Sequence, residues 1–342
     1  MHRSTRLALA VFAALLMIVG AYTAYWFYVA GQIRDGIAAW AKSAKAEKIE
    51  ASWQRIHVGG FPTAFRVELE TAALRDNAVT PSPEVQIPSL SGIARPWYFA
   101  DWRLMAPLGF VGTLAGSGDR AAVKLAAQGA HGLVSIEPEG GWKLWLRVDD
   151  ANLEAAGRVR INAADTWIAV PPTAPHTHTD SKIALAGSAR QVELPVAISP
   201  LGSTIDELDV GLTVKGAISD GKLADVAAAW RDAGGMIELD RLRLIWGGLG
   251  ATAAGTIALD QQLQPIAGFS GAIQGYDSIL SALVESGRMR ATDAGLARIA
   301  LTMLAKAGPD GKPEIKTAFT IQNGQMFLGP VKLGKAPHLA WN

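Results

Sequence analysis

Apolar and polar side chains alternate with a period of two along much of the chain after residue 49. Between Phe65 and Glu70, phenylalanine, valine and leucine alternate with arginine and glutamate, which places the two sets on opposite faces of a strand. Parallel sheets buried on both faces would show unbroken apolar runs instead, so this pattern predicts antiparallel sheets with one covered face. Similar runs, one of them broken by Pro195 at an expected edge or bulge, lie at 142–148, 192–198, 208–214 and 315–321.

Three short segments have helical spacing instead. They lie at 223–230, 279–284 and 296–303, and they are expected to stop at Gly234 and Gly235, at Gly287, and near Gly308 and Pro309. The predicted fold class is therefore a β-dominated α+β fold, in which antiparallel, curved sheets carry about three short covering helices.

The N-terminal segment contains no charged side chain from Leu7 to Ile33. As a helix it would be about 40 Å long, more than the roughly 30 Å of a bilayer's hydrocarbon core. Arg3 and Arg6 precede it, and the positive-inside rule places residues 1–6 in the cytoplasm. We expect a single-pass transmembrane helix at 7–33, a helical juxtamembrane linker at 34–48, and the bulk of the chain outside the inner membrane.

Aromatic residues at the far end of this segment resemble the belt found where a retained helix meets the outer headgroups. A cleaved signal peptide is the alternative, because it also has a basic start and an apolar core, but no Ala-x-Ala site directly follows the core. Further along, Ile33, Ile37, Trp40 and Ala44 form an apolar stripe that lies on the membrane or, as we favour, packs under the first strands. The predicted belt consists of Tyr22, Tyr25, Trp26, Phe27 and Tyr28.

The stretch from Trp53 to Glu70 predicts a hairpin that begins the sheet just outside the membrane. Gly59 and Gly60 allow positive φ, and Pro62 fixes the exit. Trp53 breaks the alternation, which indicates a bulge or a twist before the turn. A proline-rich loop at 171–182 is the expected boundary between two β-rich parts, 49–170 and 183–342.

The composition excludes several classes of function. The net charge is only +1, so nucleic acid is not an expected partner. The absence of cysteine excludes disulfides, cysteine-ligated zinc, iron–sulfur clusters and thiol nucleophiles.

Three stretches resemble a known family: Trp53 with Gly59–Phe65, Arg95–Trp97, and Asn323–Leu339. They look like the bacterial inner-membrane family catalogued as domain of unknown function 2125, which has no established activity. More loosely, Gly255–Leu283 resembles the strand, turn, strand and helix unit at the end of AsmA-like envelope proteins. That likeness implies a single-span, periplasmic, β-rich protein, and several members of that wider group are linked to lipid movement or outer-membrane assembly.

Candidate catalytic residues are few. His176, His178 and Asp180 lie in the proline-rich loop, where we expect solvated side chains rather than a zinc site. The neighbouring carboxylates of Glu137 with Glu139, and of Asp149 with Asp150, are also expected to be solvated. Glycine-rich turns explain 116–119 and 247–250, which lack the features of a phosphate-binding loop. We therefore expect no catalytic, cofactor-binding or metal-binding residue, and no enzyme.

An aromatic cluster between Arg95 and Phe110 is the most suggestive surface candidate. It either packs in the core, which we favour, or meets the outer leaflet, where aromatic rings sit at headgroup depth and arginine reaches phosphate. The residues assigned to membrane-surface or lipid contact are Trp97, Tyr98, Phe99 and Trp102, with Arg95 and Arg103.

The sequence thus favours a non-catalytic, membrane-anchored periplasmic protein of envelope maintenance. We expect it to bind or handle lipid in an apolar β-sheet groove, with the inner-membrane bilayer, a lipid ligand or envelope proteins as partners and no cofactor. One alternative is a scaffold that pairs with envelope proteins at its sheet edges. The other is a periplasmic hydrolase.

Overall fold

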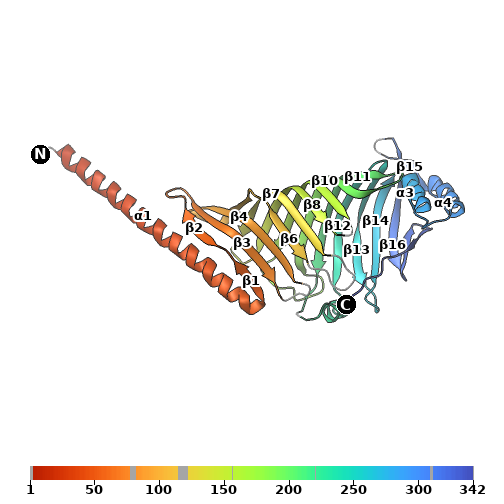
Figure 1. The fold of residues 1–342 in the computed structure, drawn as a ribbon, viewed down its shortest axis with the longest axis horizontal. Helices are drawn as coiled ribbons and strands as arrows, with labels where there is room; N and C mark the ends of the chain where they lie inside the picture. Colours follow the sequence, from red (N-terminus) through yellow and green to blue (C-terminus); the bar gives the residue numbers. More distant parts are fainter. Residues whose placement is uncertain are drawn as a thin grey trace. The chain divides into compact units, whose positions relative to one another are not determined.

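The computed structural model describes residues 3–77, 82–114, 122–155, 157–219, 221–308 and 311–341. It confirms the β-rich α+β class, with a long N-terminal helix, antiparallel strands and few short helices (Figure 1). The chain forms two compact units, Met1–Ser135 and Ile136–Asn342.

Unit 1, Met1–Ser135, consists of one long helix and an antiparallel sheet. Strand β3 pairs with β1, β2 and β4; β4 also pairs with β5 and β6, and both of these pair with β7. The elements are α1 (Arg3–Ala44), a 3-10 turn (Lys45–Glu47), β1 (Ile49–Ser52), β2 (Arg55–Gly59), β3 (Phe65–Asp76), β4 (Pro83–Arg95), β5 (Tyr98–Ala106), β6 (Phe110–Leu114) and β7 (Val123–Ile136).

The C-terminal half of α1 packs on the start of this sheet. Trp26 is only 2% exposed, and its ring stacks on Phe65 of β3 with 5.0 Å between centroids. Ile33 and Ile37 pack against the same cluster, which also contains Val58. The part of the predicted apolar stripe formed by Ile33 and Ile37 therefore packs under the first strands, as favoured from the sequence.

The predicted hairpin is present, whereas the irregularity near Trp53 is a break between β1 and β2 that leaves their register with β3 unchanged. Strand β2 pairs with β3 from Gly59 opposite Arg66 to Arg55 opposite Glu70, and Gly60 has a φ of +98°. Strands β1 and β2 both pair with β3 and are interrupted at residues 53–54, where the phase of the alternation changes. The charged side of β3 is exposed, and Arg55 pairs with Glu70 at 2.9 Å.

Unit 2, Ile136–Asn342, contains a sheet in which each strand from β8 to β14 pairs with the next in the chain. Strand β14 then pairs with β16, followed by β17 and β18, while β15 also pairs with β16. The strands are β8 (Trp142–Glu154), β9 (Arg158–Val170), β10 (Ser181–Ile198), β11 (Gly202–Lys215), β12 (Met236–Trp246), β13 (Leu249–Leu259), β14 (Pro265–Gln274), β15 (Lys306–Ala307), β16 (Pro313–Gln322), β17 (Gln325–Leu328) and β18 (Val331–Lys335).

The three predicted helices are α2 (Leu223–Asp232), α3 (Tyr276–Glu285) and α4 (Ala291–Leu304). Helices α3 and α4 pack together at the β16 end of the sheet (Figure 1), where Tyr276, Leu280 and Leu301 form a buried cluster with Ile315 and Leu328. The alternating runs predicted from the sequence lie in β3, β8, β10, β11 and β16, and the register of β10 is irregular around Pro195.

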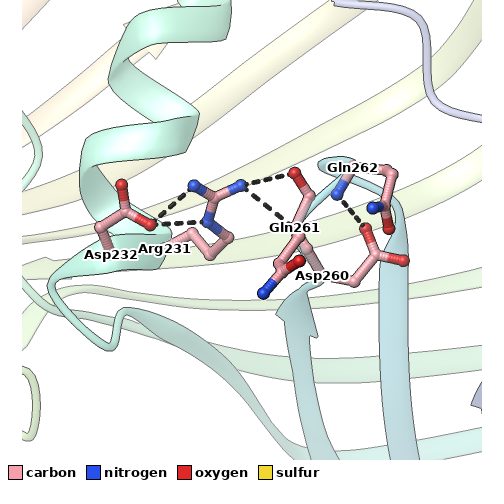
Figure 2. A network of polar contacts seen from close by, with 5 residues as sticks. All are labelled: Arg231, Asp232, Asp260, Gln261 and Gln262. Atoms are coloured by element: carbon pink, nitrogen blue, oxygen red, sulfur yellow. Dashed lines mark hydrogen bonds and ion pairs between the residues drawn. The ribbon is translucent and has the colours of Figure 1, made fainter.

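Polar contacts hold α2 against the turn between β13 and β14. Arg231 at the end of α2 donates hydrogen bonds to the carbonyl oxygens of Asp260 and Gln261, at 3.2 and 3.0 Å, and pairs with Asp232 at 2.6 Å (Figure 2). The Asp260 carboxylate accepts from the backbone N–H of Gln262 at 2.9 Å and so closes the turn. This network has a structural role, since its carboxylates and guanidinium are used within it.

The proline-rich loop has a different role from the predicted one. Val170 ends β9 and Ser181 starts β10, and these two strands pair directly on either side of the loop. The loop is therefore a connection within unit 2, and the division between compact units falls at Ser135 and Ile136 instead. Proline interrupts strands in both situations, so composition alone does not separate a long hairpin loop from a boundary.

We predict that Trp26→Ala lowers the stability of unit 1 by about 3–5 kcal/mol, because it removes a buried aromatic side chain from the cluster with Phe65. Thermal unfolding of the full chain in detergent measures the effect. Tyr28→Ala is the matched control, since Tyr28 is an exposed aromatic residue on the same helix. Equal unfolding temperatures for the two variants would contradict the packing of α1 described above.

A second stability prediction concerns Gly235, where a Cβ atom would lie 2.3 Å from the Trp230 indole. The indole cannot move freely, because its Nε1 donates to the Lys215 carbonyl at 2.7 Å. Gly235→Ala should therefore destabilise unit 2 by about 1–3 kcal/mol in denaturant unfolding. Gly295→Ala, in an open position of α4, should be neutral or stabilising; destabilisation of similar size in both variants would refute this.

Candidate functional site: the apolar face of the second sheet

The pairing register of unit 2 aligns apolar residues from strand to strand on one face. Residues directly opposite each other in neighbouring strands share a face, so the pairings define continuous rows across the sheet. The first row contains Leu144, Ile168, Leu185, Leu212, Leu239, Gly255, Phe269, Phe319, Leu328 and Val331; the second, Leu146, Thr166, Gly187, Val210, Leu242, Ala253, Gly271 and Thr317; the third, Val148, Ala164, Ala189, Leu208, Leu244, Ala251, Ile273 and Ile315.

We call these three rows the apolar face. They contain no charged side chain, and threonine supplies their only hydroxyl groups. The first row crosses ten strands, from β8 to β18, which at about 4.8 Å per strand is about 43 Å. This length exceeds the roughly 15 Å depth of one leaflet of a 30 Å hydrocarbon core.

The opposite face of the same strands is polar and carries cross-strand ion pairs. Arg147 of β8 pairs with Asp165 of β9 at 3.1 Å, and Arg241 of β12 pairs with Asp209 of β11 at 2.7 Å. Arg243 pairs with Glu207 between β12 and β11 at 3.3 Å. The sheet therefore has one face suited to water and one suited to apolar contacts.

Most of the apolar face between β8 and β13 is only half-buried. Of the large apolar side chains in its rows on these strands, Val148 and Leu239 are buried, whereas the others keep intermediate exposure. Leu185, Leu212 and Leu242 are examples of the second kind. A face of this size in contact with water is unfavourable, and exposed apolar patches of this kind mark sites of interaction.

The β14 to β18 end of the face is covered differently. Helices α3 and α4 bury Ile315 and Leu328, and Ile273, Phe319 and Val331 pack partly against the same cluster. The helices thus close one end of the apolar face and leave the β8 to β12 rows without this cover.

A cavity of about 260 Å³ lies on the apolar face beside the covered end. It is close to the lower limit of roughly 300 Å³ for small-molecule pockets, and its lining is almost entirely apolar. The lining residues are Leu239, Leu242, Ala251, Thr252, Ala253, Phe269, Gly271, Ile273, Thr317, Phe319 and Leu328. Such a cavity accepts a hydrocarbon group and offers little hydrogen bonding to a polar one.

The structure places part of the aromatic cluster predicted as a surface site in the core and leaves the rest exposed. Phe99 and Trp102 pack against the Trp26 and Phe65 cluster, and Trp102 Nε1 donates to the Phe99 carbonyl at 3.1 Å. Trp97 and Tyr98, at the β4–β5 turn, are 68% and 53% exposed. Arg95 and Arg103 are also exposed.

The predicted aromatic belt is divided in the same way. Trp26 is a core residue of unit 1, so its ring is directed to the sheet rather than to a lipid layer. Tyr25, Phe27 and Tyr28 are exposed. Tyr22 donates a hydrogen bond to the Pro62 carbonyl, and Tyr25 donates to the Pro96 carbonyl at 3.2 Å, so the β2–β3 and β4–β5 turns both contact α1 at this level.

The histidine pair of the proline-rich loop does not form a metal site with Asp180. Both histidines are exposed, and the Asp180 carboxylate accepts hydrogen bonds at 2.9 Å from the backbone N–H groups of His176 and Thr177. These bonds, chiefly that from Thr177, lower the pKa of Asp180 below its usual value. Asp180 closes a turn, and the described part of the chain contains no group of three or more His, Asp or Glu residues placed to hold a metal.

The structure also shows where the candidate carboxylate pairs and glycine-rich motifs lie. Glu137 pairs with Lys143 at 2.6 Å, and Asp149 with Arg147 at 3.3 Å. Gly247 and Gly248 form the turn between β12 and β13, as predicted. The stretch 116–119 lies outside the described residues.

Sequence reasoning found the alternation in β8, β11 and β16 and missed the register that joins these strands into one face. In β12, a bulge between Leu239 and Leu242 adds one residue and breaks the period of two. The signal in the sequence is the polar pair Asp240 and Arg241, which separates two apolar positions that share the face.

Comparisons with known proteins give a family and no function. A search of curated proteins found no match, and neither did a search of solved structures. A model for one family, described as an uncharacterized protein conserved in bacteria (DUF2125), matches residues 26–337 and so covers both units of the fold. The chain therefore belongs to this DUF2125 family.

Proposed function

We propose that this protein is a membrane-anchored, non-catalytic lipid-handling protein of the bacterial envelope. In this proposal α1 crosses the inner membrane, the two units lie in the periplasm, and the apolar face of unit 2 holds acyl chains. The observation that carries the proposal is the continuous, half-buried apolar face with its cavity of about 260 Å³. Hydrocarbon chains are the ligands that such a face binds without unpaired polar groups.

The anchor is supported by the length, composition and packing of α1. This helix is long and apolar enough to cross a membrane, with a mean hydropathy of 1.9, a property that a signal sequence shares. Its side chains from Leu9 to Val19 are exposed, whereas unit 1 packs on it from Tyr22 to Ile37. From Leu7 to Tyr22 the helix is about 24 Å long, most of a roughly 30 Å hydrocarbon core, so we place the outer end of the span near Tyr22 rather than at Ile33.

Packing also favours retention of this helix over cleavage. Removal of α1 as a signal peptide would take Trp26 and Ala30 out of the core and would expose Phe65 and Val67. Exposure of that cluster would cost several kcal/mol at roughly 1.5–3 kcal/mol for each large side chain.

The turns that contact α1 are suited to the outer headgroup region. Phe61, Trp97 and Tyr98 are exposed at these turns, next to Tyr22 and Tyr25 on the helix. Aromatic side chains concentrate at this depth of a bilayer. Exposed Arg95 and Arg103 on the same strands are available to lipid phosphate.

The resemblance to AsmA-like envelope proteins supports this proposal by analogy. The segment Gly255–Leu283 forms the end of β13, β14 and most of α3, which is the strand, turn, strand and helix order of that resemblance. Fold-level analogy of this kind suggests lipid movement without identifying a lipid.

The two alternatives have less support. Strand addition needs an open edge. Among the residues that the structure describes, β18 pairs with β17 alone, and it carries Lys332 and Lys335, which oppose such addition. A hydrolase needs converging acid and base groups, whereas Glu137 and Asp149, one carboxylate of each predicted pair, are engaged in ion pairs with Lys143 and Arg147.

The lipid proposal predicts that the full chain, purified in detergent, carries lipid that solvent extraction and mass spectrometry detect. Ala253→Phe should lower the bound lipid several-fold, because the new ring fills the cavity on the apolar face. Thr256→Phe introduces the same ring at an exposed position on the opposite face of β13 and should leave binding unchanged. Lipid-free protein that also takes up no fluorescent fatty-acid probe would refute the proposal, as would equal binding by the two variants.

The anchor proposal predicts that an epitope placed before Arg3 stays on the membrane-bound protein. A reporter fused at the C-terminus, active only outside the cytoplasm, should be functional. Loss of the epitope with retention of the reporter signal would identify α1 as a signal peptide. A silent reporter on a well-expressed fusion would reverse the orientation.

A further inference from the structure

Helix α4 carries apolar side chains on its outer side as well as on the side that it buries. Ala294, Ala297 and Leu301 face the core of unit 2. A second row on the outer side follows i, i+3 and i+7 spacing, which places its members on one side of the helix. We call this row, together with Leu304, the α4 stripe; it comprises Leu296, Ile299, Met303 and Leu304, and its first three side chains are 70%, 62% and 83% exposed.

Such exposure is unusual for large aliphatic side chains grouped on one helix. A helix that is apolar on both sides is normally covered on both sides, and contiguous exposed patches mark interaction surfaces. Within unit 2 the stripe faces away from the buried cluster, so the packing of α3 and α4 on the sheet does not account for it.

A groove of about 590 Å³ adjoins the stripe, between α4 and the turn that leads into β18. Its lining includes the apolar side chains of Met289, Leu296 and Val331. Its rim is basic, with Arg288, Arg290 and Lys332 around the single carboxylate of Asp293.

The charges of the rim are available to a ligand. Asp293 pairs with Arg290 at 2.9 Å, and neither Arg288 nor Lys332 has an ion-pair partner among the residues that the structure describes. Residues 286–341 contain eight Lys and Arg against three Asp and Glu, a net charge of +5 in a chain of net charge +1. The end of unit 2 is therefore the basic part of an otherwise slightly acidic chain.

We propose that the α4 stripe and the adjoining basic groove dock on a membrane surface that contains anionic phospholipids. Protruding aliphatic side chains beside basic residues suit a lipid interface, where apolar groups enter the acyl boundary and basic groups meet anionic headgroups. Leu296, Ile299 and Met303 enter the acyl boundary, while Arg288 and Lys332 meet phosphate. This docking involves a different surface from the apolar face of the sheet and does not depend on lipid binding there.

A tethering assay with the full chain tests the proposal. The protein is placed by its anchor in nanodiscs of zwitterionic phosphatidylcholine, and free vesicles are added with or without phosphatidylglycerol. Flotation should carry the discs with the anionic vesicles and leave them behind with the neutral ones. Capture should weaken as salt is added, because salt screens the basic groove.

Single substitutions distinguish the contributions of the α4 stripe and of the basic groove from a general effect of adding surface charge. Leu296→Glu and Ile299→Glu should each lower capture about tenfold or more, since each removes the insertion of one large apolar side chain. Arg288→Glu should lower it about fivefold or more. Leu223→Glu is the matched control, because Leu223 is a 65% exposed leucine on α2, and it should capture vesicles as the wild type does.

Three results would overturn the proposal. The first is equal capture of neutral and anionic vesicles by the wild type, and the second is full capture by the stripe and Arg288 variants. The third is a change of mass from dimer to monomer on Leu296→Glu in light scattering, which would show that a second copy of the chain covers the stripe. Arg288→Glu alters a surface charge only, so it remains informative where a stripe variant fails to fold.

Discussion

The strict alternation of side chains along a β-strand is the constraint on which the structure of unit 2 depends. Because each strand is paired in a fixed register with its neighbours, an apolar residue at one position requires an apolar or small residue opposite it on the next strand. The row from Leu144 to Val331 satisfies this requirement across ten strands. A slip of one residue in any strand would place its leucines and valines among the ion pairs of the opposite face, so the register and the two-faced character of the sheet enforce each other.

The same constraint explains why helices are needed at the ends and scarce between them. A helical element covers the apolar side chains near one end of the sheet in each unit. In unit 1 this is α1, whose Trp26 stacks on Phe65; in unit 2 it is α3 with α4, whose Leu280 and Leu301 cover Ile315. These are the places where side chains become fully buried. Along β8 to β12 the chain provides no comparable cover in the described residues, and the apolar face keeps its half-buried character.

Local patterns allowed much of this fold to be predicted, because strand alternation, helical spacing and glycine stops act over a few residues. The strands at 65–69, 142–148 and 208–214, the three short helices and the hairpin around Gly60 are all present. Long-range properties were not accessible in the same way. Nothing local in the aromatic run after Leu7 shows that Trp26 faces a sheet while Tyr28 faces outward, since that distinction depends on Phe65, far along the chain. The prediction of a belt therefore grouped a core residue with exposed ones, and the placement of the unit boundary at the proline-rich loop failed for a similar reason.

The small residues of the late strands combine two properties, a roomy surface and close packing of neighbouring strands. A Cβ atom at Gly255 would lie 2.1 Å from the Gly268 carbonyl oxygen, and one at Gly271 would lie 2.0 Å from that of Thr252. The backbones of β13 and β14 therefore approach each other at positions where no other residue fits without displacing a strand. Gly271 also lines the cavity, together with Ala251 and Ala253. The absence of side chains thus brings the two strands together and leaves room above them, so a larger residue here would disturb the sheet and fill the cavity at once. The close approach of β13 and β14 requires glycine at these positions. The same lack of side chains leaves space on the apolar face, so this space follows from the backbone geometry. A hydrocarbon ligand would occupy it.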